Sequence, residues 1–262
     1  MTRCVLVCLL VCLGAPIAAR AQQQPAAADA SPAFELLPGY DFRIGLEHLS
    51  GDDPRFVWDA HYGGVIGLFD YRGLRLNMVA DYEALLGNEY QPFDPLQGNY
   101  ALGGSLGGKV GGVQLDVVMH HLSRHMGDRA KRDAIAWNMY GGRVSGTRTR
   151  GALRMDSRAL LRFSTNKAFV DYNWEVEAGT TGRYRVRSKA SWIWAGELRR
   201  IGVDGTRNRG TQTGYRVEGG VRLDGRAGDL EVVAGYERRI DPYQLEFGTV
   251  QWVTAGFRVV SR

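Results

Sequence analysis

The chain has 262 residues, a formal net charge of +5, 35 glycines, 8 prolines and three cysteines. Its length and glycine content fit one large all-β domain better than two ordinary domains. No stretch approaches the roughly 18 uncharged apolar residues of a transmembrane helix, which excludes a helical membrane protein. The excess of positive charge is too small to indicate nucleic-acid binding.

The first 21 residues have the pattern of a secretory signal peptide. Arg3 precedes an apolar run, and Ala19-Arg20-Ala21 is the small-x-small pattern that signal peptidase reads. We expect export and cleavage after Ala21. The loss of Arg3 and Arg20 then lowers the formal charge to 31 − 28 = +3.

The three cysteines, Cys4, Cys8 and Cys12, all lie in this leader. The mature chain therefore has no thiol for a disulfide or a thiolate metal site. Acylation of Cys8 or Cys12 in a lipoprotein is the alternative, although the small residues expected before a lipid-carrying cysteine precede neither. Residues 22–40, rich in Gln, Ala and Pro, are predicted to be a flexible lead-in.

From residue 41 onward, apolar and polar residues alternate with a period of two. In residues 212–224, for example, the apolar Tyr215 and Val217 flank the charged Arg216. Such alternation predicts β-strands with one apolar and one polar face. Most are longer than the strands of a soluble sandwich and match tilted membrane-crossing strands. The twelve predicted strands are 42–49, 56–69, 74–84, 100–109, 113–125, 134–143, 153–163, 168–178, 184–198, 212–224, 230–240 and 247–260.

The connections between these segments alternate between short and long. Residues 70–73, 110–112, 179–182 and 225–228 form the short set, and residues 87–98, 126–133 and 202–210 belong to the long set. Short turns on one rim and long loops on the other are typical of a bacterial outer-membrane barrel with both termini in the periplasm.

The polar faces of neighbouring segments carry opposite charges. Arginines recur in residues 153–163, carboxylates in 168–178 and basic residues again in 183–189. Toward lipid such charges would cost roughly 2 to 4 kcal/mol each at the midplane, whereas in a narrow lumen they can pair. The opposite face, with Tyr172, Trp174, Trp192 and Trp194, then meets lipid.

We therefore expect residues 41–262 to form an all-β, twelve-stranded antiparallel transmembrane β-barrel with a charge-filled lumen. Its location is the bacterial outer membrane, and its partners are membrane lipids. A lumen full of paired charges is a poor pore. A soluble periplasmic β-barrel is the alternative.

One polar row interrupts the lipid-facing side. The odd-numbered residues from 113 to 119 are apolar, and His121, Ser123 and His125 continue that row, whereas His120 points to the lumen. Chain direction places the row at the outer rim of the barrel. Asn138 on the next predicted strand shares the outward phase. A loop centred near residues 130 and 131 would place Asn138 across from Ser123.

These residue types match a serine hydrolase. A histidine two residues from a serine on one strand face can take the hydroxyl proton as the serine attacks an acyl carbonyl, while an amide side chain orients the imidazole. The hypothesis is acyl-ester hydrolysis of outer-leaflet lipid, with Ser123 as nucleophile, His121 as base and Asn138 as orienter.

The sequences HLS at residues 121–123 and AWNMY at 136–140 resemble outer-membrane phospholipase A. The resemblance implies a twelve-stranded barrel with a lipid-facing Ser-His-Asn site. The chain departs from that family directly after the serine, where the family has Asn-Gly and this chain has Arg124 and His125. The family's calcium ligands and oxyanion hole are therefore not carried over.

The longer sequence HLSRHMGD, residues 121–128, is similar to the His-x-Ser-Ser-His-x-Gly-Asp signature of a family of uncharacterised bacterial outer-membrane barrels. This similarity adds His125 to the candidate site but implies no activity. His121, His125 and Asp128 are also an alternative metal set. The two histidines lie about 13 Å apart along an extended strand, which disfavours shared ligation.

The competing hypothesis is a non-catalytic outer-membrane barrel with a structural or a lipid- or solute-binding role. Polar side chains at the headgroup level are common without chemistry. The sequence leaves cofactor, natural lipid and calcium dependence open, and a homodimer is compatible with it.

Overall fold

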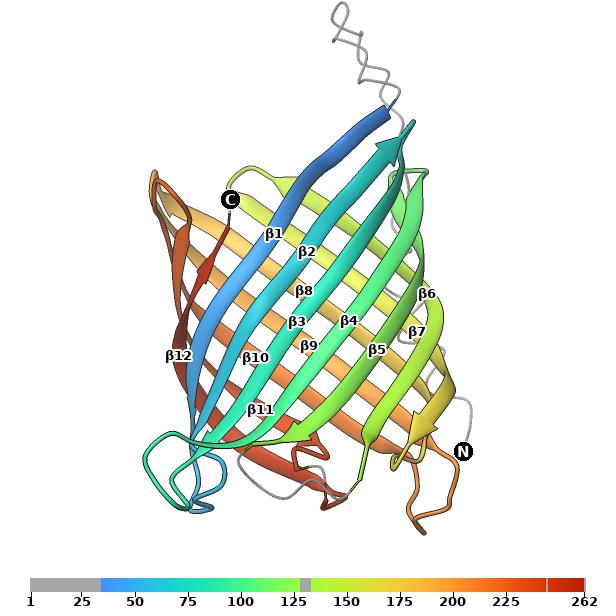
Figure 1. The fold of residues 1–262 in the computed structure, drawn as a ribbon. Coiled ribbons are helices and arrows are strands. Elements are labelled where there is room, and N and C mark those ends of the chain that lie inside the picture. Colours follow the sequence, from blue (N-terminus) through green and yellow to red (C-terminus); the bar gives the residue numbers. More distant parts are fainter. Residues whose placement is uncertain (1–33, 128–132, 244, 262) are drawn as a thin grey trace, which may run out of the picture. The chain divides into compact units, whose positions relative to one another are not determined.

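The computed structural model describes residues 34–127, 133–243 and 245–261. Within them, twelve antiparallel strands form one closed barrel, in which each strand pairs with its chain neighbours and the last closes on the first (Figure 1). This confirms the predicted fold class. The strands are β1 (Phe34–Leu49), β2 (Trp58–Tyr71), β3 (Leu74–Gly87), β4 (Asp94–Val110), β5 (Val113–Met126), β6 (Ile135–Arg150), β7 (Leu153–Ala168), β8 (Tyr172–Arg187), β9 (Ala190–Val203), β10 (Gln212–Asp224), β11 (Asp229–Ile240) and β12 (Thr249–Val260).

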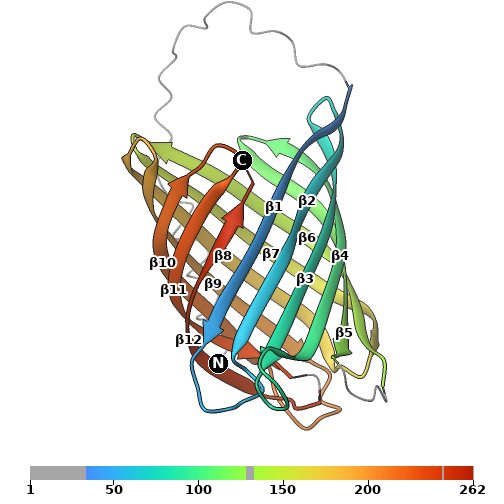
Figure 2. The same cartoon turned by 60° about the vertical axis from the view of Figure 1, so that its left-hand side comes forward.

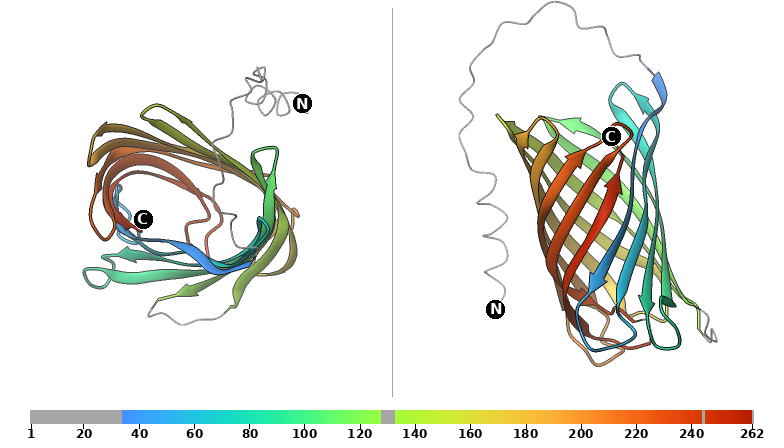
Figure 3. Two further views of the ribbon diagram at one scale, coloured as in Figure 1. Left: turned by 90° about the horizontal axis from the view of Figure 1, so that it is seen from above. Right: turned by 90° about the vertical axis from the view of Figure 1, so that its left-hand side faces the viewer.

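The connections alternate in length as predicted. Two residues join each of the pairs β2–β3, β4–β5, β6–β7 and β8–β9, and four join β10–β11, whereas three to eight residues connect the strands at the other end. Both Phe34 and Val260 lie at the short-turn end, because Phe34 pairs with Tyr71 and Val260 pairs with Asp229. The strands are strongly tilted (Figure 2), and their wall encloses an interior (Figure 3, left).

Most strand boundaries differ from the prediction, and the first strand begins much earlier than expected. β1 begins at Phe34, seven residues (41 − 34) before the predicted start of the barrel. The register between β1 and β2 shifts between Leu36 and Gly39, and this bulge interrupts the alternation without ending the strand. The predicted leader and residues 22–33 of the lead-in lie outside the described residues.

The prediction of a turn at residues 179–182 is wrong. These residues lie inside β8, pair with both β7 and β9, and the chain turns at Ser188 and Lys189 instead. Residues 184–187 therefore end the eighth strand rather than begin the ninth. Gly182 has a packing role, since a Cβ there would collide with the ring of Trp194.

The outward face is mainly apolar and carries aromatic residues, here called the aromatic border, near the long-loop end. Tyr62, Tyr82 and Tyr100 pair across β2, β3 and β4, with ring centroids 5.0 and 4.6 Å apart. Ten residues (110 − 100) separate Tyr100 from Val110 at the opposite end of β4. At about 3.3 Å per residue and with a typical tilt, this length spans roughly 25 Å, the height of a lipid-facing band.

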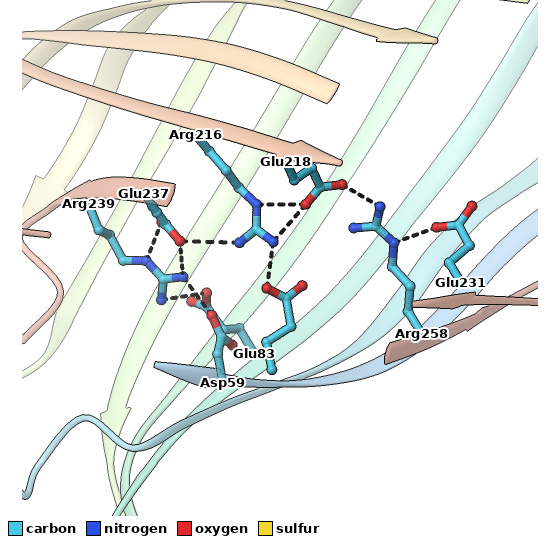
Figure 4. A network of polar contacts seen from close by, with 9 residues as sticks. Asp59, Glu83, Arg216, Glu218, Glu231, Glu237, Arg239 and Arg258 are labelled. Carbon is cyan, nitrogen blue, oxygen red and sulfur yellow. Dashed lines mark hydrogen bonds and ion pairs between the residues drawn. The ribbon is translucent and has the colours of Figure 1, made fainter. Parts of the chain in front are cut away.

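Paired charges line the middle of the lumen (Figure 4), which confirms the predicted charged interior in part. Arg239 contacts Asp59 and Glu237 at 2.6 Å each and Glu83 at 3.1 Å. A second group joins Glu175 to Arg162 at 2.9 Å and to Arg199. Carboxylates from neighbouring strands satisfy the guanidinium donors, which offsets the cost of removing both charges from water.

The outer end of the lumen also contains two buried apolar clusters, which the sequence did not predict. One buried cluster contains Ile135, Trp137, Met139, Val170, Tyr172, Ile201 and Ile240. A second contains Leu49, Phe56, Leu85, Leu96 and Trp252. Within the described residues, no helix is long and apolar enough to cross a membrane.

The prediction that Tyr172 faces lipid is wrong, although Trp192 and Trp194 do face outward, with 56% and 37% exposure. The register of β8 with β9 shifts between Tyr172 and Trp174, so the extra residue, Asn173, reverses the phase. The buried Tyr172 hydroxyl donates a hydrogen bond to Asp241 Oδ2 at 2.6 Å.

Candidate functional site

The candidate site lies on the outward face of β5 and β6, at the end near the long loops. Strand phase is as predicted. Val117 and Met119 are 68% and 40% exposed, and Arg124, of opposite parity, is 8% exposed. His121 and Ser123 belong to the outward row and are half-buried. Ser123 pairs with Tyr100 of the aromatic border, so the site lies at the level of that border.

His121 and Asn138 form the shortest contact in this row. They are direct partners in the register of β5 and β6, and His121 Nδ1 lies 2.7 Å from Asn138 Oδ1. An amide oxygen only accepts hydrogen bonds, so Nδ1 carries the proton and donates it. This tautomer leaves Nε2 of His121 with a free lone pair, which is the form a general base needs.

Ser123 contacts the other histidine of the row. Its hydroxyl Oγ lies 3.3 Å from His125 Nε2. The His125 ring packs edge-on against Tyr100, with centroids 5.0 Å apart and planes at 90°. Among the described residues, no hydrogen bond joins Ser123 to His121 or Asn138. The row therefore consists of two adjacent pairs, His121 with Asn138 and Ser123 with His125.

The predicted pairing of Ser123 with Asn138 is wrong. Ser123 pairs with Ala136, and the β5–β6 register centres on 129.5, half of 121 + 138, rather than near 130.5. A slip of two residues keeps every side chain on the same face, so polarity alone could not choose the register. Packing inside the barrel distinguishes the two registers, because Trp137 lies beside Leu122 and under the guanidinium of Arg124, 5.2 Å away.

Arg124, which departs from the phospholipase pattern, does not enter the lipid-facing row. Its side chain points into the barrel and donates a hydrogen bond from Nη1 to the backbone oxygen of Asp241 at 2.6 Å. His120 is also on the inner face, opposite Met139. The difference at Arg124 therefore affects the interior of the barrel, and the difference at His125 affects the site.

Two residues of this surface are absent from the site predicted from sequence. Tyr100 lies across from Ser123, and the predicted hairpin of strands 100–109 and 113–125 could have indicated it. Asn166 reaches the face of Asn138 because the β6–β7 register skips Thr165. A bulge of this kind has no signal in the alternation pattern.

Loops close over the outer end of the lumen behind the site. Arg209 contacts Asp171 and Asp241 at 2.5 and 2.8 Å. Burial opposes the charge on Arg209, but its hydrogen bonds with Asp171 and Asp241 outweigh this and raise its pKa. Asp171, predicted to belong to the charge ladder of a strand, is therefore a loop anchor.

Metal ligation by His121, His125 and Asp128 gains no support. Among the described residues, no group of three or more His, Cys, Asp or Glu side chains is arranged to hold a metal ion. Asp128 lies outside those residues. His121 and His125 instead use one ring nitrogen each on Asn138 and Ser123.

No protein-family model matches the chain, and no curated protein matches it significantly. Among solved structures, it is similar to outer membrane phospholipase A from Escherichia coli, with 10% identity, a TM-score of 0.53 and coverage of 87% of this chain and 98% of that chain. It is also similar to an outer membrane channel from Pseudomonas putida F1, with 12% identity, a TM-score of 0.51 and coverage of 90% of this chain and 99% of that chain. LpxR from Salmonella typhimurium has 6% identity and a TM-score of 0.50, with coverage of 84% of this chain and 99% of that chain.

These likenesses show the fold, which is that of an outer-membrane barrel. A phospholipase and a channel share it, so the fold does not select an activity.

Proposed function

We propose that the chain is a bacterial outer-membrane protein that is exported with cleavage after Ala21 and inserted with its apolar face in lipid. The apolar face, about as high as a lipid-facing band, and the paired charges inside support this location. Migration on an unboiled gel tests insertion. A folded barrel in detergent should migrate faster than the boiled chain, and identical migration would contradict the location.

We further propose that this protein hydrolyses acyl esters of outer-leaflet lipids at Ser123. One observation carries the proposal: on a face that is mainly apolar, His121, Ser123, His125 and Asn138 are hydrogen-bonded in pairs at the level of the aromatic border. Polar groups that face lipid cost free energy, so a cluster of them on adjacent strands calls for a function.

The proposed reaction uses a serine nucleophile and a histidine base. Ser123 Oγ forms a bond to the ester carbonyl carbon while its proton passes to an imidazole. The tetrahedral intermediate then expels the lysolipid oxygen, which takes that proton from the imidazolium. Water, deprotonated by the same imidazole, attacks the acyl-serine carbonyl, and the fatty acid is released as Ser123 Oγ takes the proton back from the imidazolium.

We assign the base role to His121, because its Nδ1 proton is held by Asn138 and its Nε2 is the basic atom. His121 and Ser123 lie two residues apart on one face, roughly 7 Å between Cα atoms, a span that a histidine side chain can bridge. In the structure Ser123 Oγ is held by His125, so a rotation about χ1 of Ser123 precedes attack.

The decisive assay measures fatty-acid release from phospholipid micelles by purified, folded protein. Ser123→Ala should lower the rate at least a thousandfold. The matched control is Ser157→Ala, since Ser157 is also an outward serine but is hydrogen-bonded to Thr180 on β8, away from the row. Equal release by the native protein and Ser123→Ala would sink the serine mechanism. If the rate of fatty-acid release per protein molecule rises with the protein-to-detergent ratio, the active form is a homodimer.

The competing function is a non-catalytic barrel that binds a small polar solute. A lumenal cavity of about 960 Å³, lined by charged residues including Arg154, Arg158 and Arg183, favours it. The cavity reaches Ser261 at the short-turn end, while the apolar clusters fill the long-loop end. This arrangement supports binding from the periplasmic side rather than passage. Lumenal substitutions that alter solute binding, together with no effect of Ser123→Ala on any lipid, would favour this function.

A further inference from the structure

A group of basic side chains, here called the basic rim, lies at the short-turn end of four adjacent strands. It consists of Arg148 and Arg150 at the end of β6, Arg185 and Arg187 at the end of β8, and Lys189 in the β8–β9 turn. All five are exposed. The two hairpins adjoin, because the Arg185 backbone N–H donates to the Ala152 carbonyl at 3.0 Å.

The basic rim has no acidic counterpart. Seven basic residues lie in residues 147–157 and 183–190, against the single acidic Asp156. Arg154 pairs with Asp156 at 2.9 Å, and Arg183 pairs with Asp224 at 2.6 Å. The structure records no ion pair for the other five within the residues that it describes.

Other hairpins at the same end carry fewer cations without an ion pair among the described residues, namely Arg72, Lys109 and Arg226. Arg75 contacts Asp70 at 3.1 Å beside the β2–β3 turn, and Arg222 contacts Asp229 at 2.5 Å beside the β10–β11 turn. Excess positive charge is therefore concentrated on the β6–β9 side of the rim.

Strand geometry gives the depth of the basic rim. Arg148 follows Asn138 by ten residues (148 − 138), the same separation as between Tyr100 and Val110 across the apolar band. Both β6 residues are outward, since Arg148 pairs with Met155 in the phase of Val144 and Tyr140. Beside them, Tyr184 is 48% exposed and pairs with Leu153. An outward arginine directly below apolar and aromatic residues lies at the headgroup level.

We propose that the basic rim binds the phosphate groups of anionic phospholipids in the periplasmic leaflet. Guanidinium groups bind phosphate oxygens in a bidentate manner, and cations close to a membrane surface attract anionic lipid. The position of Arg148 and Arg150 at the headgroup level makes lipid phosphate, rather than a soluble anion, the partner that meets their side chains. The proposal rests on the membrane insertion proposed above but not on ester hydrolysis.

The test counts lipids retained by the purified full-length barrel in native mass spectrometry, after exchange into micelles that contain equal phosphatidylglycerol and phosphatidylethanolamine. The native protein should retain phosphatidylglycerol preferentially. Arg148→Gln together with Arg150→Gln should reduce that preference about tenfold. The matched control is Arg72→Gln with Lys109→Gln, which removes the same charge from other hairpins at the same end and should change the preference less than twofold.

Each outcome decides the proposal. Equal loss in the test and control pairs, or no lipid preference in the native protein, would overturn it. Complete competition by excess soluble glycerol phosphate would also overturn it, because the site would then bind a free anion. Unchanged preference in Ser123→Ala would separate lipid binding from hydrolysis, and heat-modifiable migration of each variant would show that the barrel is folded and inserted.

Discussion

Polar side chains on the inner and outer faces of β5 and β6 make different contacts. On the inner face, Arg124 donates to the Asp241 carbonyl and Arg143 pairs with Asp116 at 2.9 Å. On the outer face, the side chains of His121 and Asn138 hydrogen-bond to each other, and neither forms an ion pair among the described residues. The polar residues of the inner face have a structural role, because their ion pairs and hydrogen bonds join neighbouring strands and loops. The polar residues of the outer face make few such contacts, so we infer that they have a functional role.

Substitution of the two adjacent histidines of β5, which lie on opposite faces, tests most directly whether the faces have different roles. His121→Ala should lower fatty-acid release about a thousandfold, because it removes the general base. His120→Ala, which changes the inner face at the neighbouring position, should keep the rate within about threefold if the barrel folds. Equal losses in initial-rate measurements of the two variants would mean that position in the lipid-facing row does not matter.

The inner face should instead determine stability. Glu175 is fully buried between Arg162 and Arg199, so Glu175→Gln leaves the buried Arg162 and the half-buried Arg199 short of a counter-charge. We expect a loss of about 3 kcal/mol in urea unfolding of the detergent-folded barrel. The control Glu246→Gln, in an exposed loop pair with Arg55, should lose less than about 1 kcal/mol. A large loss in the loop variant and none in the buried one would contradict the distinction.

Asn138→Ala sharpens the role of the amide. Loss of the 2.7 Å contact frees the His121 ring to adopt other orientations and tautomers, so kcat should fall roughly ten- to a hundredfold while KM changes little. Asn166→Ala on the neighbouring strand supplies the matched control. A rise in KM with unchanged kcat for Asn138→Ala would assign the amide to lipid binding.

Most of the fold could be predicted because period-two alternation and alternating loop lengths are local properties. The wrong predictions of which face a side chain occupies lie where the backbone is irregular. The bulge at Asn173 turned Tyr172 inward, and the skipped Thr165 brought Asn166 outward. Neither bulge can be recognised from a hydropathy pattern, because one extra residue reverses the face on which the following side chains lie while the residue types of the strand stay ordinary.

For the site, sequence predicted which residues share a face but not which of them touch. Asn138 could be placed outward by parity, yet its partner is His121 rather than a residue at the position of Ser123. Registers two residues apart are equivalent in polarity and differ only in packing around Trp137. Long-range packing of this kind is not encoded in a short window of sequence.

The smallest expected effect concerns an exposed pair in the β1–β2 loop. The hydrogen bond from the Arg55 side chain lowers the pKa of Asp53 below its ordinary value of 3.8. Its contribution is therefore present above that value and is lost as the pH falls through the lowered pKa. Asp53→Asn should lower Tm slightly near neutral pH, and the difference from the native protein should vanish in strong acid. A difference that grows in acid would reverse the sign of this contribution.

The central claim is that Ser123 is an activated nucleophile on a lipid-facing surface. Its most direct test is covalent labelling of the folded barrel with a long-chain fluorophosphonate, followed by peptide mass spectrometry. We expect phosphonylation at Ser123, little at the outward control Ser157, and a strongly reduced rate at Ser123 in His121→Ala. No modification of Ser123, or an equal rate in His121→Ala, would contradict the account.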